Sequence, residues 1–124
     1  MSGCDTDRPV RPRIARIWTG RTRPDRADAY QRYLLEAGVP PLVATALGVE
    51  VFREDGVEAT TFMTVSWWES VAAMARFAGA DPRRVHHLPR DAELLLALPP
   101  AVRVLDIVAR HGAAIPPGSH AIVI

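Results

Sequence analysis

The chain has 124 residues, of which 48% are hydrophobic and 23% charged, and its formal net charge is +1. This composition is that of a globular domain, and a net charge so close to zero gives no electrostatic reason to expect nucleic acid or an acidic membrane as a partner. The length corresponds to one domain, small enough that a second copy would help to bury apolar surface, so we expect a homodimer.

The amino-terminal part of the chain is polar and contains the single cysteine, Cys4. We expect residues 1–12 to form a disordered leader. One cysteine allows no internal disulfide, and the chain has no Cys-His spacing of a zinc site, which fits a reducing, cytoplasmic setting. No apolar run reaches the ~18–20 residues of a membrane span, and the leader has no apolar core of the signal-peptide kind.

The first regular element is predicted over residues 13–20, which are rich in β-branched and aromatic side chains. Their alternation predicts a β-strand with Ile14, Arg16 and Trp18 on one face. An arginine and a tryptophan would thus share one face of the sheet.

A helix is predicted over residues 24–38. Pro24 stands at its start, apolar residues follow at spacings of three and four, and Gly38 is a typical stop. Pro40 and Pro41 then predict a break, followed by a loose connector.

Two strands are predicted over residues 48–53 and 57–68, joined through Asp55 and Gly56. An Asp-Gly pair between two alternating runs is a strong signal for a β-hairpin. The hairpin would place these two strands side by side and antiparallel.

The end of the second hairpin strand leads directly into a helix. Strand alternation places Phe62 and Trp68 on one face and Trp67 on the other. Ser70 can cap the helix, and Gly79 ends it. The apolar stripe of this helix is predicted to consist of Val71, Met74, Phe77 and Ala78.

The remaining elements are a short helix over residues 89–98 and a last strand over 101–109. The order β-α-β-β-α-(α)-β is the split βαβ arrangement of a ferredoxin-like α+β domain, with one antiparallel sheet and its helices on one face. The domain would span residues 13–109, and its uncovered sheet face would pair with a second copy. The C-terminal extension, 110–124, would add an edge strand or pack on the partner subunit, with a frayed terminus as the alternative.

From residue 14 to residue 108 the chain resembles the antibiotic biosynthesis monooxygenase (ABM-like) superfamily. The resemblance rests on three segments, Ile14-Ala-Arg-Ile-Trp-Thr-Gly20, Ser66-Trp-Trp-Glu-Ser70 and Val102-Arg-Val-Leu-Asp-Ile-Val108. It implies that two ferredoxin-like domains form a dimeric α/β barrel, with a pocket between the sheet and the helices. Members of the superfamily include cofactor-free monooxygenases, haem-degrading enzymes, polyketide cyclases and isomerising enzymes.

Haem degradation is not predicted for this chain. The haem-degrading members use an asparagine, a tryptophan and a histidine in the following helix. Trp68 matches the tryptophan, but Phe77 or a neighbour stands at the histidine position and the chain contains no asparagine. The quinone-forming members use a tryptophan with asparagine, tyrosine and arginine, and here too only Trp68 matches by motif.

Three residues are candidates for catalysis. His86 and His87 lie in a segment that would close the mouth of the pocket. Histidine titrates close to neutrality, so either could remove a phenolic or carbon-bound proton and leave a carbanion that passes an electron to oxygen. Trp68 would stack on a flat substrate. The alternatives are two ordinary loop histidines and a core tryptophan, and no metal site is expected because adjacent histidines diverge.

Five further residues are candidates for substrate binding. The guanidinium of Arg16 could hold a carboxylate or stabilise an enolate, and the alternative is a salt bridge to Glu50 or Glu69. The other four candidates are aromatic, namely Trp18, Tyr33, Phe62 and Phe77. For each of these the alternative is a place in the core.

The expected function is that of a small homodimeric, monooxygenase-like enzyme of secondary metabolism. It would act on an aromatic or polyketide-like small molecule without a tightly bound cofactor. A cyclase or isomerase using the same pocket is one alternative, because a base and an enolate-stabilising arginine are enough for either reaction. A ligand-binding accessory dimer without catalysis is another.

Overall fold

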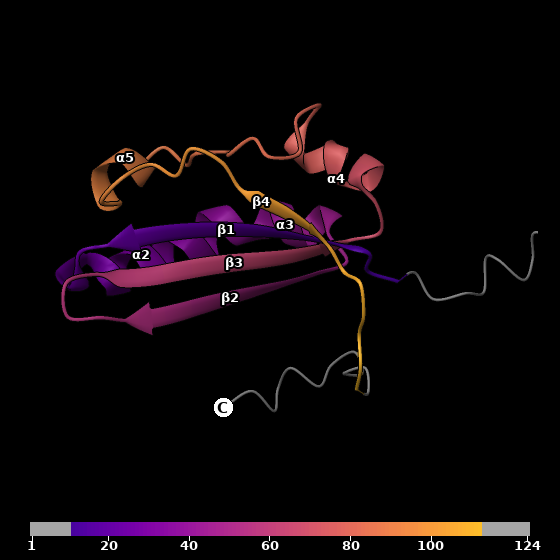
Figure 1. Cartoon of the computed structure of the whole chain (residues 1–124). Helices are drawn as coiled ribbons and strands as arrows, with labels where there is room; N and C mark the ends of the chain where they lie inside the picture. The colour runs from indigo at the N-terminus through magenta and orange to yellow at the C-terminus, as the bar shows by residue number, and fades with distance from the viewer. Residues whose placement is uncertain (1–10, 113–124) are drawn as a thin grey trace, which may run out of the picture.

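The computed structural model describes residues 11–112 of the chain (Figure 1). The predictions on Cys4, the leader and the C-terminal extension concern residues that lie wholly or mostly outside this range. The described elements are β1 (Ile14–Thr22), η1 (Pro24–Arg26), α2 (Ala27–Tyr33), η2 (Leu34–Gly38), α3 (Val39–Thr45), β2 (Gly48–Asp55), β3 (Thr60–Trp68), α4 (Val71–Ala78), α5 (Asp91–Leu94) and β4 (Arg103–Asp106).

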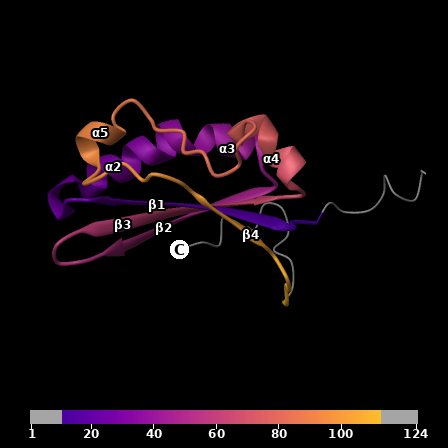
Figure 2. The same ribbon diagram turned by 45° about the horizontal axis from the view of Figure 1, so that its top comes forward.

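The four strands form one antiparallel sheet in the order β2-β3-β1-β4. Figure 2 shows the helices α2, α3, α4 and α5 on one side of this sheet, with the other side left uncovered by the described residues. The protein is therefore a mixed α+β domain whose strand order is compatible with the predicted ferredoxin-like fold.

The central strands bury one face and leave the other partly accessible. Along β3 the burial alternates at every residue, because successive side chains of a strand point to opposite faces. Trp68 is buried beneath the helices and Trp67 lies on the open face, as the alternation predicted. The predicted face of β1 is confirmed as well, since Ile14, Arg16 and Trp18 are all buried.

The prediction that helical structure stops near Gly38 is wrong. After α2 the chain instead forms the wider π-helical turn η2 and then continues as the α-helix α3. Pro40 and Pro41 lie in the first turn of α3. Proline is tolerated there because first-turn N–H groups have no acceptor in their own helix. The predicted loose connector is therefore mostly helical.

The helix after the paired tryptophans forms as predicted. The hydroxyl of Ser70 accepts a 3.0 Å hydrogen bond from the backbone N–H of Ala73, which caps α4. Gly79 ends the helix with a φ of 80°, a left-handed conformation that glycine adopts without steric cost. Met74 and Ala78 of the predicted stripe are buried.

Several element lengths differ from the predictions. The hairpin is present, but its loop spans residues 56–59 instead of 54–56, and a 2.9 Å hydrogen bond from Gly56 N to Ala59 O closes it. The helix predicted over 89–98 shortens to α5, because Leu95 leaves the helix to form a β-bridge with Thr22. β1 runs two residues further than predicted, to Thr22, while β4 is shorter than expected. No helix within the described range is long and apolar enough to cross a membrane.

The side chains between sheet and helices form two separate apolar clusters. The first contains Trp18, Ala27, Tyr30, Leu34, Phe62, Leu94, Leu95 and Val102. The second contains Ile14, Leu42, Trp68, Met74 and Ala78, with Phe77 packed against it. The two clusters do not merge, and this division leaves room for the cavity described next.

Candidate functional site

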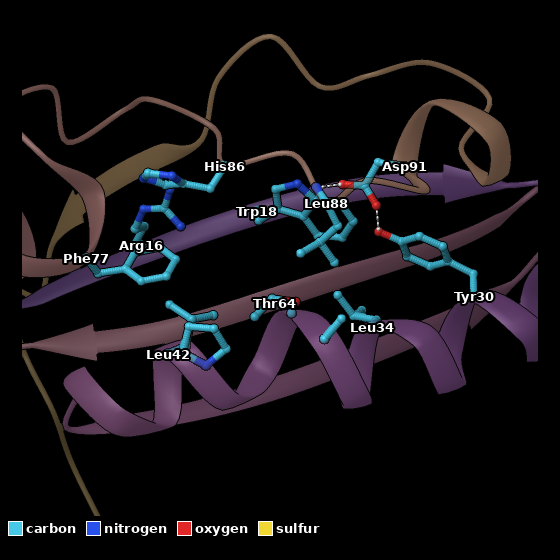
Figure 3. Close-up of a pocket in the computed structure, with 13 residues that line it drawn as sticks. Arg16, Trp18, Tyr30, Leu34, Leu42, Thr64, Phe77, His86, Leu88 and Asp91 are labelled. Carbon is cyan, nitrogen blue, oxygen red and sulfur yellow. Dashed lines mark hydrogen bonds between the residues drawn. The ribbon is translucent and has the colours of Figure 1, made fainter.

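A cavity of about 260 Å³ lies between the sheet and the helices (Figure 3). Residues of both apolar clusters line its sides, and residues of the segment between α4 and α5 cover it. The lining residues are Arg16, Trp18, Tyr30, Leu34, Ala37, Gly38, Pro41, Leu42, Thr64, Phe77, His86, Leu88 and Asp91. Most of these side chains are apolar. The few polar groups among them are therefore the ones that could orient a ligand or react with it.

One wall of the cavity is built by the π-helical segment and the helix that follows it. Leu34, Gly38 and Leu42 come from this wall. A π-helical turn fits one more residue than a regular turn, and such turns are frequent at functional sites. A Cβ atom at Gly38 would lie only 2.9 Å from the Leu34 side chain and 3.3 Å from that of Leu88, so this part of the wall is closely packed.

Trp18 forms part of the wall contributed by β1. Its ring lies directly over Gly20 of the same strand, where a Cβ would fall 2.4 Å from the ring. The ring also stacks with that of Tyr30, at 6.3 Å between centroids and 18° between planes. Gly20 thus gives the tryptophan the space that its orientation requires.

Arg16 brings a positive charge to one end of the cavity. The side chain is 5% exposed, and its one hydrogen bond within residues 11–112 runs from Nη2 to the carbonyl oxygen of Arg84, at 2.8 Å. The guanidinium lies over the ring of Phe77, 5.1 Å from its centroid. Burial lowers the pKa of Arg16 to about 10, which still leaves it cationic at neutral pH. The salt bridges predicted as alternatives, to Glu50 or Glu69, are not formed.

Two residues that line the cavity each carry a buried polar atom that has no hydrogen-bond partner within the described chain. These atoms are Nε of Arg16 and the hydroxyl oxygen of Thr64. Both residues are 5% exposed, so bulk water does not reach them easily. Buried polar groups are normally hydrogen-bonded, so two unpaired ones on residues that line a single cavity make this cavity a candidate ligand site.

His86 lies at the rim of the cavity, at the same end as Arg16. It is exposed to solvent, yet it lines the cavity, and its ring centroid lies 5.0 Å from that of Phe77. Arg16, Phe77 and His86 therefore gather at one end, as Figure 3 shows. A ligand there would meet a cation, an aromatic face and a possible proton acceptor.

The opposite end of the cavity carries a buried tyrosine and carboxylate. The hydroxyl of Tyr30 donates to Oδ1 of Asp91 at 3.0 Å, and Oδ2 of Asp91 accepts from the backbone N–H of Leu88 at 2.9 Å. Burial raises the pKa of Tyr30, and the charge of Asp91 and the hydrogen bond to it raise that pKa further. Tyr30 therefore keeps its proton and acts as a donor.

These contacts hold residues 79–90, which we call the cover segment, over the cavity. Besides the bond from Leu88 to Asp91, the backbone N–H of Arg90 donates to the hydroxyl of Tyr33 at 3.0 Å. The carbonyl of Arg84 accepts from Arg16 further along the segment. The cover segment has no regular structure of its own, so its position depends on these individual bonds.

The structure brings together four of the eight residues predicted from sequence to form the site, namely Arg16, Trp18, Phe77 and His86. The other four do not line the cavity. Trp68 is 1% exposed and lies behind Phe77, with its Nε1 donating to Ser66 at 2.9 Å. Phe62 is in the core against Tyr30, and Tyr33 supports the cover segment. His87 is exposed beside His86.

Thr64 and Asp91 are the functional candidates that sequence reasoning missed. Thr64 lies on the same face of β3 as Phe62 and Trp68, but nothing in the sequence indicates that its hydroxyl has no partner within the described residues. Asp91 reaches the cavity through contacts with Tyr30, which is distant in sequence, and no local pattern signals such a contact.

No group of three or more histidine, cysteine, aspartate or glutamate side chains is placed to hold a metal ion within residues 11–112. Comparison of the chain with protein-family models, curated proteins and solved structures finds no match. The resemblance to the ABM-like superfamily therefore remains a prediction.

Proposed function

We propose that this protein is a small enzyme that binds a flat aromatic or polyketide-like molecule in the cavity and removes a proton from it. The observation that carries the proposal is the gathering of Arg16, Phe77 and His86 at one end of the cavity. A base at the rim and a fixed cation beside it are the two groups that enolate formation needs.

In this proposal the imidazole of His86 takes the proton from an acidic C–H or phenolic O–H. The electron pair of the broken bond stays on the substrate, which becomes an enolate or phenolate. Arg16 stabilises the negative oxygen, and Phe77 supports the substrate ring. With O₂ as co-reactant the carbanion form of this anion gives electrons to O₂ and forms a C–O bond, and the resulting hydroperoxide loses one oxygen atom as water to leave a carbonyl on the oxidised substrate, as in the monooxygenase-like function expected from the sequence. Without O₂ the anion closes a ring or takes its proton back at another carbon.

The adjacent histidines provide the test. Only His86 lines the cavity, so His86→Ala should lower turnover by about a hundredfold or more, while His87→Ala should leave it nearly unchanged. Oxygen uptake and product formation with a panel of hydroxylated aromatics, in air and under nitrogen, would separate oxygenation from cyclisation or isomerisation. Equal effects of the two substitutions would remove His86 from the mechanism.

A second candidate function is ligand binding without catalysis. Its support is that His86 makes no side-chain hydrogen bond to a carboxylate within the described chain, whereas catalytic bases are commonly oriented by a third group. Tight binding of aromatic ligands, with no turnover in air or under nitrogen, would favour this function over the first.

We further propose that two copies of the chain associate through the open face of the sheet, as the dimeric α/β barrel would require. The support is the apolar character of that face. Its partly or largely exposed side chains include Ile17, Phe52, Met63, Val65, Trp67 and Leu105. Apolar side chains gathered on one sheet face, here with the charged Glu50 and Arg103 among them, are typical of a protein interaction surface.

A further inference from the structure

Resting on the proposed function, which places a ligand in this cavity, we propose that the ligand is a small planar acid. Its anionic oxygen pairs with Arg16, and a second oxygen of the same molecule hydrogen-bonds to Thr64. The proposal thus assigns a chemical class to the ligand and an orientation to its binding.

The charge of the ligand follows from the environment of Arg16. A guanidinium has five N–H donors, and Arg16 uses one of them in its single hydrogen bond within residues 11–112. No carboxylate of the described chain forms a salt bridge with it. A buried charge without a counter-charge costs free energy, and an anion bound in the cavity would offset that cost.

The second contact follows from Thr64. Arg16 lies opposite Ser66 in the sheet and Trp18 lies opposite Thr64, so Arg16 and Thr64 are diagonal neighbours on adjacent strands. Such neighbours are about 7 Å apart, a separation that one small molecule can bridge. The Thr64 hydroxyl is buried and has no partner within residues 11–112, so once a ligand displaces the atoms that cover it, it can donate to a carbonyl oxygen or accept from a hydroxyl group of that ligand.

The orientation follows from the opposite end of the cavity. There Asp91 accepts hydrogen bonds on both carboxylate oxygens, from Tyr30 and from the backbone of Leu88. A negative charge at that end repels an acid, so the acid group lies at Arg16 and the ring extends toward Trp18.

The size of the ligand follows from the volume. About 260 Å³ lies just below the roughly 300–1,000 Å³ that is usual for small-molecule pockets. The walls on either side are apolar or aromatic, with Leu34, Leu42 and Phe77 among them. A planar group of one or two fused rings with an acidic substituent suits this space.

Calorimetric titration with matched probes tests the proposal. The first pair is 1-naphthoate and its neutral amide, 1-naphthamide. The second pair is 1,3-indanedione, ionised to its enolate at mildly alkaline pH, and the neutral ketone 1-indanone. We expect the anion of at least one pair to bind about tenfold to a hundredfold more tightly than its neutral partner. Preference within the first pair identifies a carboxylate site, and preference within the second an enolate site.

Substitutions then locate the anion. Arg16→Met should abolish the preference for the anion, and Arg16→Lys should keep part of it, because the charge stays and the planar fork is lost. Arg90→Met is the matched control, since it also removes a guanidinium that lies over an aromatic ring, but outside the cavity. It should leave the preference intact. Thr64→Val should weaken binding of the preferred anion severalfold.

The possible failures are distinguishable. Equal binding of anion and neutral probe, or a preference that survives Arg16→Met in a folded protein, overturns the acid-binding site and leaves the proposed cavity function standing. If no probe of either pair binds, the proposed function itself fails together with the ligand class. Circular dichroism of Arg16→Met confirms folding, which we expect to be retained because the substitution removes an unpaired buried charge.

Discussion

Tyr30 and Asp91 are 61 residues apart in sequence and share a buried 3.0 Å hydrogen bond that ties α2 to α5. The same carboxylate accepts from the backbone of Leu88, so one side chain joins the helical layer and the cover segment. Asp91 is therefore one of the contacts that hold the cover segment in place, together with Tyr33 and Arg16.

Asp91→Ala should destabilise the protein by about 2–3 kcal/mol, because it leaves the buried Tyr30 hydroxyl and Leu88 N–H without an acceptor. Glu93→Ala, an exposed change on the same helix, should cost no more than about 0.5 kcal/mol. Urea unfolding measures both. Hydrogen exchange should quicken in the cover segment of Asp91→Ala more than in β1 or β3. Uniform exchange throughout the domain would show that Asp91 has no special role in holding this segment.

The raised pKa of Tyr30 predicts a loss of stability at alkaline pH. Below the ordinary value of 10.0 the folded and unfolded chains both hold this proton, so Tyr30 adds no pH dependence there. Above that value the unfolded chain releases the proton while the folded chain keeps it, so stability falls by up to about 1.36 kcal/mol per pH unit. Denaturant unfolding of the wild type and Tyr30→Phe at rising pH isolates this effect, since Arg16 and the other groups are common to both. A difference that does not change with pH would contradict it.

The hydroxyl of Thr64, which has no partner in the described part of the chain, predicts a stabilising substitution. Thr64→Val removes a buried polar atom without a partner and should raise the free energy of unfolding by about 1 kcal/mol. Thr22→Val is the matched control, because its hydroxyl is also buried and unpaired but lies outside the cavity. Both should stabilise the protein, and only Thr64→Val should weaken ligand binding. Thermal unfolding and calorimetry separate the two effects, and equal binding losses would argue against a contact at Thr64.

The open face of the sheet predicts where association can be disrupted. Met63→Arg places a charge in the centre of this face and should shift a dimer to monomers without changing the helical content. Val57→Arg, at a residue that is 99% exposed in the hairpin loop, should leave association unchanged. Sedimentation velocity over a concentration series gives the result. A wild-type chain that stays monomeric at all concentrations would refute the proposed dimer.

The features that could be predicted from sequence are those that depend on neighbouring residues. Period-two alternation placed Arg16 and Trp18 on the same buried face, and the Ser70 cap and Gly79 stop fixed the ends of α4. These signals are local, because strand geometry and helix capping act over only a few residues. The order of the elements predicted one antiparallel sheet with its helices on one face, and the structure has this arrangement.

The features that sequence did not predict depend on tertiary contacts. Trp68 was expected in the pocket, but the ring of Phe77 packs against it and leaves it in the core. Asp91 lies in the cavity wall because the chain folds back to contact Tyr30, which is 61 residues earlier in the sequence. Alternation decides the face on which a side chain lies. It does not decide which side chain on that face borders an empty space.

The number of residues in the π-helical turn η2 can change the shape of the cavity without changing the sheet. It separates α2 from α3, and its residues form the wall opposite the strands that carry Arg16 and Thr64. Loss of one residue there would restore a regular helical period and rotate Leu42 relative to Leu34. Gain or loss of a single residue in this helix would therefore change the shape of the cavity while every strand kept its register. A change of ligand in evolution would then need only one insertion or deletion.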